Sequence, residues 1–133
     1  CIGLNQFVCD LVADTLKSAK TEPNPNHETR VKFGRMRTHA FAARSSVYRT
    51  ARLIEAGENC VNEIMASKIL ASESIAELTD TAIQVVGGEA LIESHPLASI
   101  FRRVRATRLA EGPTDTLHAN ISRGYLDLNL GRI

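Results

Sequence analysis

The chain has 133 residues, of which 44% are hydrophobic and 23% are charged, and its formal net charge is +1 at pH 7. This length is enough for one compact domain, and this composition is typical of a globular chain rather than a disordered one. A net charge so close to zero excludes a protein that is basic over its whole surface. No stretch approaches the ~20 consecutive apolar residues of a membrane span, so we expect no membrane partner.

The three cysteines, Cys1, Cys9 and Cys60, are an odd set without a closely spaced pair. They predict no disulfide framework. We expect all three to be buried as small apolar side chains, in the cytoplasm or, in a eukaryote, the mitochondrial matrix. Because the chain starts with Cys1 rather than Met, we expect it to be a piece of a longer enzyme or a subunit of one.

Apolar residues three and four positions apart predict three helices in the first two thirds of the chain, over residues 2–20, 27–56 and 58–86. Pro23 and Pro25 separate the first two, because proline lacks an N–H and restricts the residue before it. Gly57 ends the second helix, and Gly87 and Gly88 end the third, where glycine suits a left-handed cap. The residues expected on the inner faces are Leu4, Phe7, Val8, Leu11, Val12 and Leu16, then Val31, Met36, Ala40, Ala43, Val47, Ala51 and Ile54, then Val61, Ile64, Met65, Ile75, Leu78, Ala82 and Val86.

The last third of the chain predicts two shorter helices. An arginine-rich segment runs over residues 100–110, and Glu111, Gly112 and Pro113 interrupt it. Thr114 is expected as the N-cap of a last helix that carries Leu117, Ile121, Tyr125 and Leu128. No run alternates apolar and polar residues long enough for a strand. We therefore predict an all-α fold for residues 1–133, an up-down four-helix bundle with a short extra helical segment before the last helix.

Several short motifs follow one another along the chain, each occurring once. They are Ala-Arg-Ser-Ser-Val-Tyr-Arg at 43–49, Met-Ala-Ser-Lys at 65–68 and Ala-Ile-Gln-Val-Val-Gly-Gly at 82–88, followed by Pro96-Leu97, Arg102 and Glu111-Gly112. In these residues and their separations, the chain resembles the C-terminal helical domain of the acyl-CoA dehydrogenase flavoprotein family. The spacing from Gln84 through Pro96 and Arg102 to Glu111 is the most specific part of the resemblance.

The resemblance implies a reaction and a cofactor. The family oxidises an acyl-CoA thioester to the trans-2-enoyl-CoA, with a glutamate taking the α-proton and N5 of FAD taking the β-hydrogen as hydride. Glu111 stands at the position of that base, and partial burial at a cleft would raise its pKa toward neutrality. Gln84, Gly87 and Gly88 match the turn that contacts the ADP part of an FAD bound mainly by a neighbouring subunit. A homo-oligomer, dimer or tetramer, is therefore expected, whereas the electron acceptor stays open.

Some residues depart from the family pattern. Ala90 replaces a third glycine, Arg103 replaces an Asp, and Pro113 stands where a Thr commonly contacts the flavin nucleotide. The letters of the family's Arg-x-x-Phe-Gly motif occur at residues 30–34, but about four helical turns too near Gln84, so we interpret them as part of the second helix. The 133 residues predict no β-domain to complete the site. FAD is thus expected in the complete enzyme, and the chain alone is expected to be inactive.

Two other interpretations remain open. The seven basic residues between Arg30 and Arg52, and the cluster at Arg102, Arg103, Arg105 and Arg108, allow a non-catalytic bundle that mediates oligomerisation or binds nucleic acid. Few aromatic residues and many acidic residues on the third helix favour pairing within the bundle, so we expect no nucleic-acid partner. A carboxylate metal site requires Glu-x-x-His pairs. The chain has none, Asp115 and His118 being the nearest approach, and no metal is expected.

Overall fold

The computed structural model describes residues 1–18 and 25–130, and these residues form helices and turns without a strand. In chain order they are α1 (Ile2–Ser18), α2 (His27–Glu55), α3 (Val61–Val86), the short 3-10 helix η1 (Gly88–Leu91), α4 (Pro96–Thr107) and α5 (Thr114–Leu126). The all-α prediction is confirmed. The first predicted helix included residues 19 and 20, which together with Pro23 lie outside the described residues.

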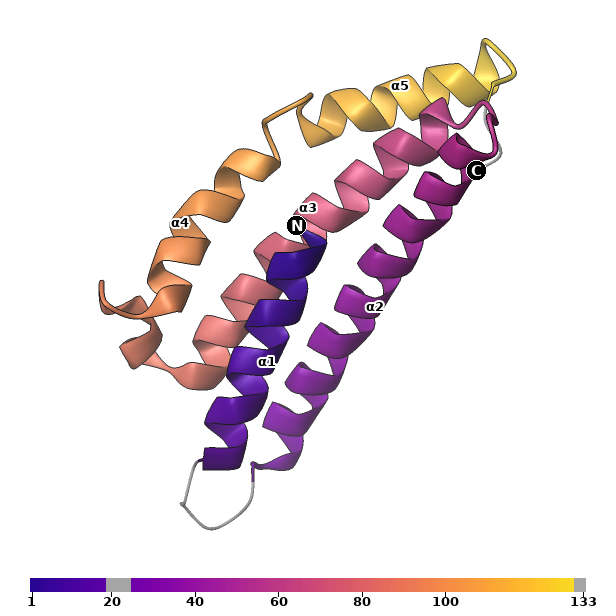
Figure 1. The fold of residues 1–133 in the computed structure, drawn as a ribbon. Helices are drawn as coiled ribbons and strands as arrows, with labels where there is room; N and C mark the ends of the chain where they lie inside the picture. Colours follow the sequence, from indigo (N-terminus) through magenta and orange to yellow (C-terminus); the bar gives the residue numbers. More distant parts are fainter. Residues whose placement is uncertain (19–24, 131–133) are drawn as a thin grey trace.

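Helix α3 is the centre of the molecule, since it packs against α1, α2, α4 and α5 (Figure 1). Helices α1, α2 and α3 lie side by side, and α4 and α5 run back along α3 one after the other. Together α4 and α5 occupy the fourth position of the bundle. The short helical segment predicted before the last helix is α4, and residues 108–113 separate it from α5.

The core lies where α1, α2, α3 and α4 meet, around fully buried side chains such as Val12, Met36, Leu78 and Leu97. Six residues predicted to face inward are instead more than a third exposed, namely Leu4, Phe7, Val31, Ile54, Val61 and Ile64. The apolar stripes on these helices are wider than the surface that the neighbouring helices cover. In the last helix Leu117 is buried and Tyr125 is exposed, and Leu128, which was predicted to belong to this helix, is exposed beyond its end.

The cysteines are free thiols, as expected, but they differ in burial. Cys9 and Cys60 are buried, whereas Cys1 is exposed, so the prediction that all three are buried was wrong for Cys1. Burial raises the pKa of the Cys9 thiol, because a thiolate loses its hydration there. Among the described residues, no helix is both long enough and apolar enough to span a membrane.

The helix ends follow from local chemistry. The Asn26 side chain accepts a hydrogen bond from the Thr29 N–H at 2.9 Å and caps α2. Helix α4 begins at Pro96, because proline suits the first turn, where its missing N–H has no helical partner. At α5 the cap position is taken by Pro113. Thr114, predicted as that cap, is the first helical residue, and its hydroxyl donates to Glu73 of α3 instead.

Candidate functional site

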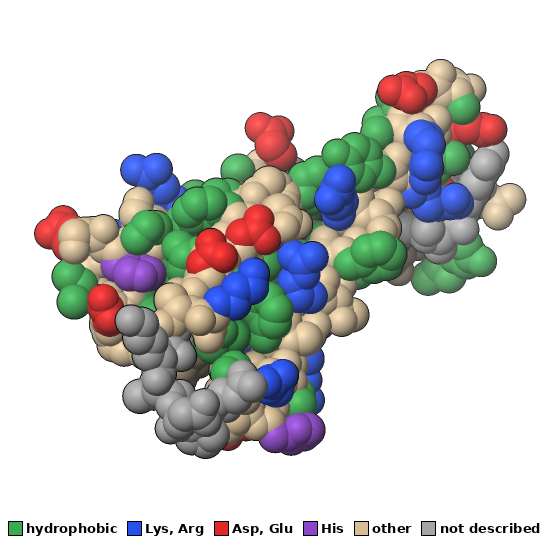
Figure 2. All heavy atoms as spheres, turned by 60° about the horizontal axis from the view of Figure 1, so that its bottom comes forward, with side chains coloured by type: hydrophobic (Ala, Val, Ile, Leu, Met, Phe, Trp, Pro, Cys, Tyr) green, Lys and Arg blue, Asp and Glu red, His purple; other side chains and the backbone are tan. Residues whose placement is uncertain are grey.

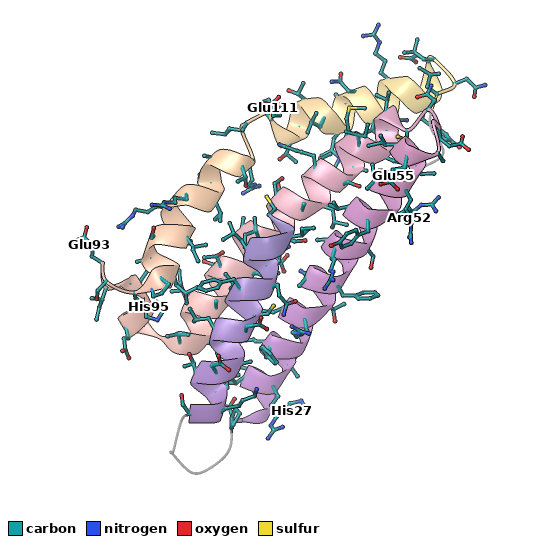
Figure 3. All side chains as sticks on the ribbon, viewed as in Figure 1. His27, Arg52, Glu55, Glu93, His95 and Glu111 are labelled. Carbon is teal, nitrogen blue, oxygen red and sulfur yellow. The ribbon has the colours of Figure 1, made fainter. Side chains whose placement is uncertain are left out.

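Glu111 lies in the break between α4 and α5 (Figure 3). Its φ is 55° and that of Gly112 is 104°, so two successive residues have positive φ. Glycine adopts this conformation freely, whereas an L residue such as glutamate rarely does. The Glu111 side chain is exposed and has no hydrogen bond or ion pair within the described part of the chain. The expected partial burial is therefore absent in this domain by itself.

Three side-chain hydrogen bonds connect this turn to α3. Lys68 Nζ donates to the Gly112 carbonyl at 2.8 Å. Glu73 Oε1 accepts from Arg108 Nε at 2.8 Å and from Thr114 Oγ1 at 2.9 Å. Arg108 and Thr114 stand on opposite sides of Glu111 in the chain, so Glu73 joins the two ends of the turn. The Thr114 hydroxyl, one position beyond Pro113, is thereby directed to α3.

Gln84, Gly87 and Gly88 lie together at the C-terminal end of α3. Gly87 has φ 93° and ψ −170°, so its φ is positive as predicted, but its ψ is extended rather than that of a left-handed helical cap. Its N–H donates to the Ile83 carbonyl at 2.8 Å and is not free for a ligand. A Cβ placed on Gly87 or Gly88 would meet nothing within 4 Å. The backbone here is open to close approach, and Gln84 is exposed beside it.

Basic side chains of α2 stand next to Gln84. Lys32, Arg35 and His39 line a hollow of about 190 Å³ between α2 and α3 together with Gln84. His39 Nδ1 lies 3.0 Å from Glu77 Oε2, and Lys32 Nζ lies 2.7 Å from Glu28 Oε1. The three residues are three and four positions apart, which places them on one face of α2. This spacing is visible in the sequence, but which helix that face meets is not.

The two candidate groups are not brought together. Gln84 and the glycines precede α4 in the chain, and Glu111 follows it. Because α4 has 12 residues, a helix of this length places its ends ~18 Å apart. The letters of the Arg-x-x-Phe-Gly motif lie within α2, as predicted, and Arg30 Nε donates to the Pro25 carbonyl at 3.0 Å.

The arginine-rich face of α4 meets acidic residues of α3. A groove of about 540 Å³ is lined by Arg102 and Arg105 of α4, by Arg108 directly after it, and by acidic residues from α3, which are Glu73, Glu77 and Asp80. Figure 2 shows Lys and Arg side chains next to Asp and Glu side chains on the face it presents, with hydrophobic atoms between them. The expected pairing within the bundle is thus seen at Arg108 and Glu73. Within the described ranges, no three His, Cys, Asp or Glu residues form a possible metal site.

Comparison with known proteins agrees with this architecture. The family model described as the acyl-CoA dehydrogenase C-terminal domain matches residues 1–126. Cyclohexane-1-carbonyl-CoA dehydrogenase of Geobacter metallireducens is 32% identical over 89 residues, which are 67% of this chain and 23% of that protein. An acyl-CoA dehydrogenase of Bacillus subtilis is 32% identical over 95 residues, which are 71% of this chain and 25% of that protein.

A solved structure of a glutaryl-coenzyme A dehydrogenase with glutaryl-CoA superposes on 98% of this chain and 34% of its own, with a TM-score of 0.89 and 19% identity. The chain thus spans about a quarter of the length of these two relatives and about a third of that structure. Because the family model covers nearly the whole chain, these 133 residues belong to the acyl-CoA dehydrogenase C-terminal domain family.

Proposed function

We propose that this domain forms one wall of the active site of an acyl-CoA dehydrogenase and that Glu111 is the general base. The observation that carries the proposal is the family match together with the place of Glu111, a carboxylate without a partner among the described residues, on a turn that hydrogen bonds connect to the central helix. An unpaired carboxylate is free to accept a proton from a bound molecule. A substrate that covered it would exclude water from the carboxylate and bring it next to the proton to be removed.

In the proposed reaction, Glu111 removes the proton from the α-carbon of an acyl-CoA thioester, and the β-hydrogen leaves as hydride. FAD, when bound, supplies the acceptor for that hydride. The products are the trans-2-enoyl-CoA, the protonated Glu111 and the reduced cofactor. Similarity to proteins that act on acyl-CoA thioesters supports the substrate class, and the electron acceptor is left open.

Gln84, Gly87 and Gly88 are the residues proposed to contact the ADP part of FAD. The open backbone at both glycines would admit a diphosphate closely, and the exposed Gln84 carboxamide could donate hydrogen bonds to it. Lys32 and Arg35, in the same hollow as Gln84, would add positive charge for the phosphates. The residues present therefore fit this part of the cofactor, whereas Pro113 offers the flavin neither a hydroxyl nor an N–H.

We further propose a homo-oligomer, a dimer or a tetramer, located in the cytoplasm or, in a eukaryote, the mitochondrial matrix. The oligomer is supported by the length of α4, which separates Gln84 and the glycines from Glu111. Gln84 and the glycines would contact an FAD bound mainly by a neighbouring subunit, while Glu111 serves the site of its own subunit.

The decisive experiment replaces Glu111 with Gln in the enzyme that carries this domain. The carboxamide keeps the shape of the side chain but cannot take a proton, so turnover should fall at least ~10²-fold while bound FAD stays unchanged. Exchange of the α-proton of a bound acyl-CoA with deuterated water measures the same step without hydride transfer, and it should be lost as well.

Glu93→Gln is the matched control, because Glu93 is an exposed glutamate before α4, at the opposite end of that helix from Glu111 (Figure 3). It should keep both the turnover and the α-proton exchange of the wild type. If Glu111→Gln retains α-proton exchange, Glu111 is not the base.

A further inference from the structure

The turn that carries Glu111 has few hydrogen bonds of its own. Among backbone hydrogen bonds, the N–H groups of Leu109 and Ala110 donate to the Ala106 carbonyl, and the Leu117 N–H donates to the Pro113 carbonyl. Pro113 has no N–H to donate. The positive φ of Glu111 is also a conformation that glutamate disfavours. Local interactions therefore do not specify the direction in which Glu111 points.

We propose that Lys68 and Glu73 are positioning residues, which hold the backbone of residues 108–114 and so aim the Glu111 carboxylate. This inference rests on the proposed role of Glu111 as the base. Lys68 binds the carbonyl of the residue directly after Glu111, and Glu73 binds a side chain on each side of it. Each of these hydrogen bonds joins a charged group to the turn, and such bonds are stronger than neutral ones.

The spacing of the two anchors explains why both are needed. Lys68 and Glu73 are five residues apart, or ~7.5 Å along the axis of α3. One anchor alone would let the turn rotate about its contact, whereas two contacts at different heights restrict both position and rotation. Both hydrogen-bonding groups are half-buried rather than fully solvated, so water competes less for them. Helix α3 is itself packed against α1, α2, α4 and α5, which makes it a rigid support.

Correct placement of a catalytic group matters because a misplacement of about 1 Å can lower a rate ~10²-fold. Lys68→Met, made in the holoenzyme, keeps the length of the aliphatic stem and removes the donor. We expect kcat per bound FAD to fall about 10- to 100-fold, with KM for the acyl-CoA and FAD content near the wild-type values. Lys68→Arg restores a donor and should recover most of the loss. Lys17→Met, at an exposed lysine near the end of α1, is the control and should change nothing.

Thr114→Val tests the second anchor with little change in shape, because it removes the hydroxyl that reaches Glu73. It should lower kcat per bound FAD in the same direction as Lys68→Met, and it keeps the test valid if the lysine variant folds poorly. Hydrogen–deuterium exchange of residues 108–114 in the holoenzyme reports the turn directly. We expect faster exchange there in both variants and unchanged exchange in the centre of α3.

The outcomes separate this inference from the proposed function. If Glu111→Gln is inactive but Lys68→Met and Thr114→Val keep wild-type kcat, the positioning role is wrong and the base assignment stands. If exchange in the turn is unchanged in both variants, the anchoring itself is wrong. If Glu111→Gln keeps its activity, the proposed function fails, and the positioning role fails with it. Loss of kcat, rescue by Lys68→Arg and faster exchange together support the inference.

Discussion

At the scale of single residues, Gly112 shows how closely the turn is fitted to its surroundings. Its φ of 104° lies where only glycine is relaxed, and a Cβ at this position would lie 3.0 Å from Leu117 Cδ2. Leu117 is a buried residue of α5, the helix that packs against α3. A side chain at residue 112 would therefore have two effects: it would strain the backbone, and it would displace the buried Leu117.

We predict that Gly112→Ala lowers the free energy of unfolding by about 1–3 kcal/mol, the usual cost of a non-glycine residue held in such a conformation. Gly34→Ala is the control, because Gly34 lies inside α2 with open space around it. Alanine there should raise the free energy of unfolding by about 0.5–1 kcal/mol. Urea unfolding of the three proteins measures both changes. Equal stability of the two variants would contradict the interpretation of the turn.

The residues that hold Glu111 were beyond prediction, although Glu111 itself was singled out. The break after α4 could be read locally, since Gly112 and Pro113 follow each other in the sequence. Lys68, by contrast, is 44 residues from the carbonyl it binds. Such a contact depends on how two helices are placed against each other, which periodicity does not specify. The exposure of Glu111 was missed for the same reason, because burial depends on what covers a turn.

At the scale of elements, the helices were predicted well because apolar periodicity and glycine or proline breaks act locally. Which part of each stripe is covered was predicted less well. Phe7 follows the same period as the buried Val8 and Val12, yet it is 48% exposed. The packing of both α4 and α5 on α3 also needed the structure, because periodicity within a helix does not specify which helix it contacts.

The contact between α5 and the first half of α3 depends on a glycine. A Cβ on Gly124 would lie 2.6 Å from Asn62 Oδ1. Asn62 is buried, and its Nδ2 donates to the Leu130 carbonyl at 2.9 Å, which ties the chain after α5 to α3. Gly124 therefore lets the two helices approach closely enough for this hydrogen bond.

We predict that Gly124→Ala destabilises the protein by about 1–3 kcal/mol, because the new methyl group must displace a buried, hydrogen-bonded side chain. The higher helix propensity of alanine offsets about 1 kcal/mol of this cost. Thermal or urea unfolding of Gly124→Ala, Asn62→Ala and the double variant forms a mutant cycle. In the Asn62→Ala background, Gly124→Ala should be neutral or stabilising. A cost that is the same in both backgrounds would show that Asn62 is not what the glycine accommodates.

At the scale of the whole molecule, α3 connects the two groups of residues that the proposed function uses. Its C-terminal end carries Gln84 and leads into the two glycines, and its middle holds the turn of Glu111. The 12 residues of α4 separate the groups. In a chain of this shape, Glu111 could belong to one active site and Gly88 to the active site of a neighbouring subunit. The proposed oligomer requires this arrangement.

Mixed oligomers test this arrangement with two variants that each inactivate the enzyme. Gly88→Asp places a carboxylate where a diphosphate would lie, and the open space there tolerates the side chain. Glu111→Gln removes the base. If each site combines Glu111 of one subunit with Gly88 of its neighbour, a mixed dimer contains one site with neither substitution. Equal mixing after reversible dissociation should then restore about a quarter of wild-type activity, because half of the dimers are mixed and each has one intact site. If both residues serve the same site within one subunit, every site in the mixture carries a substitution, and activity stays at the level of the separate variants.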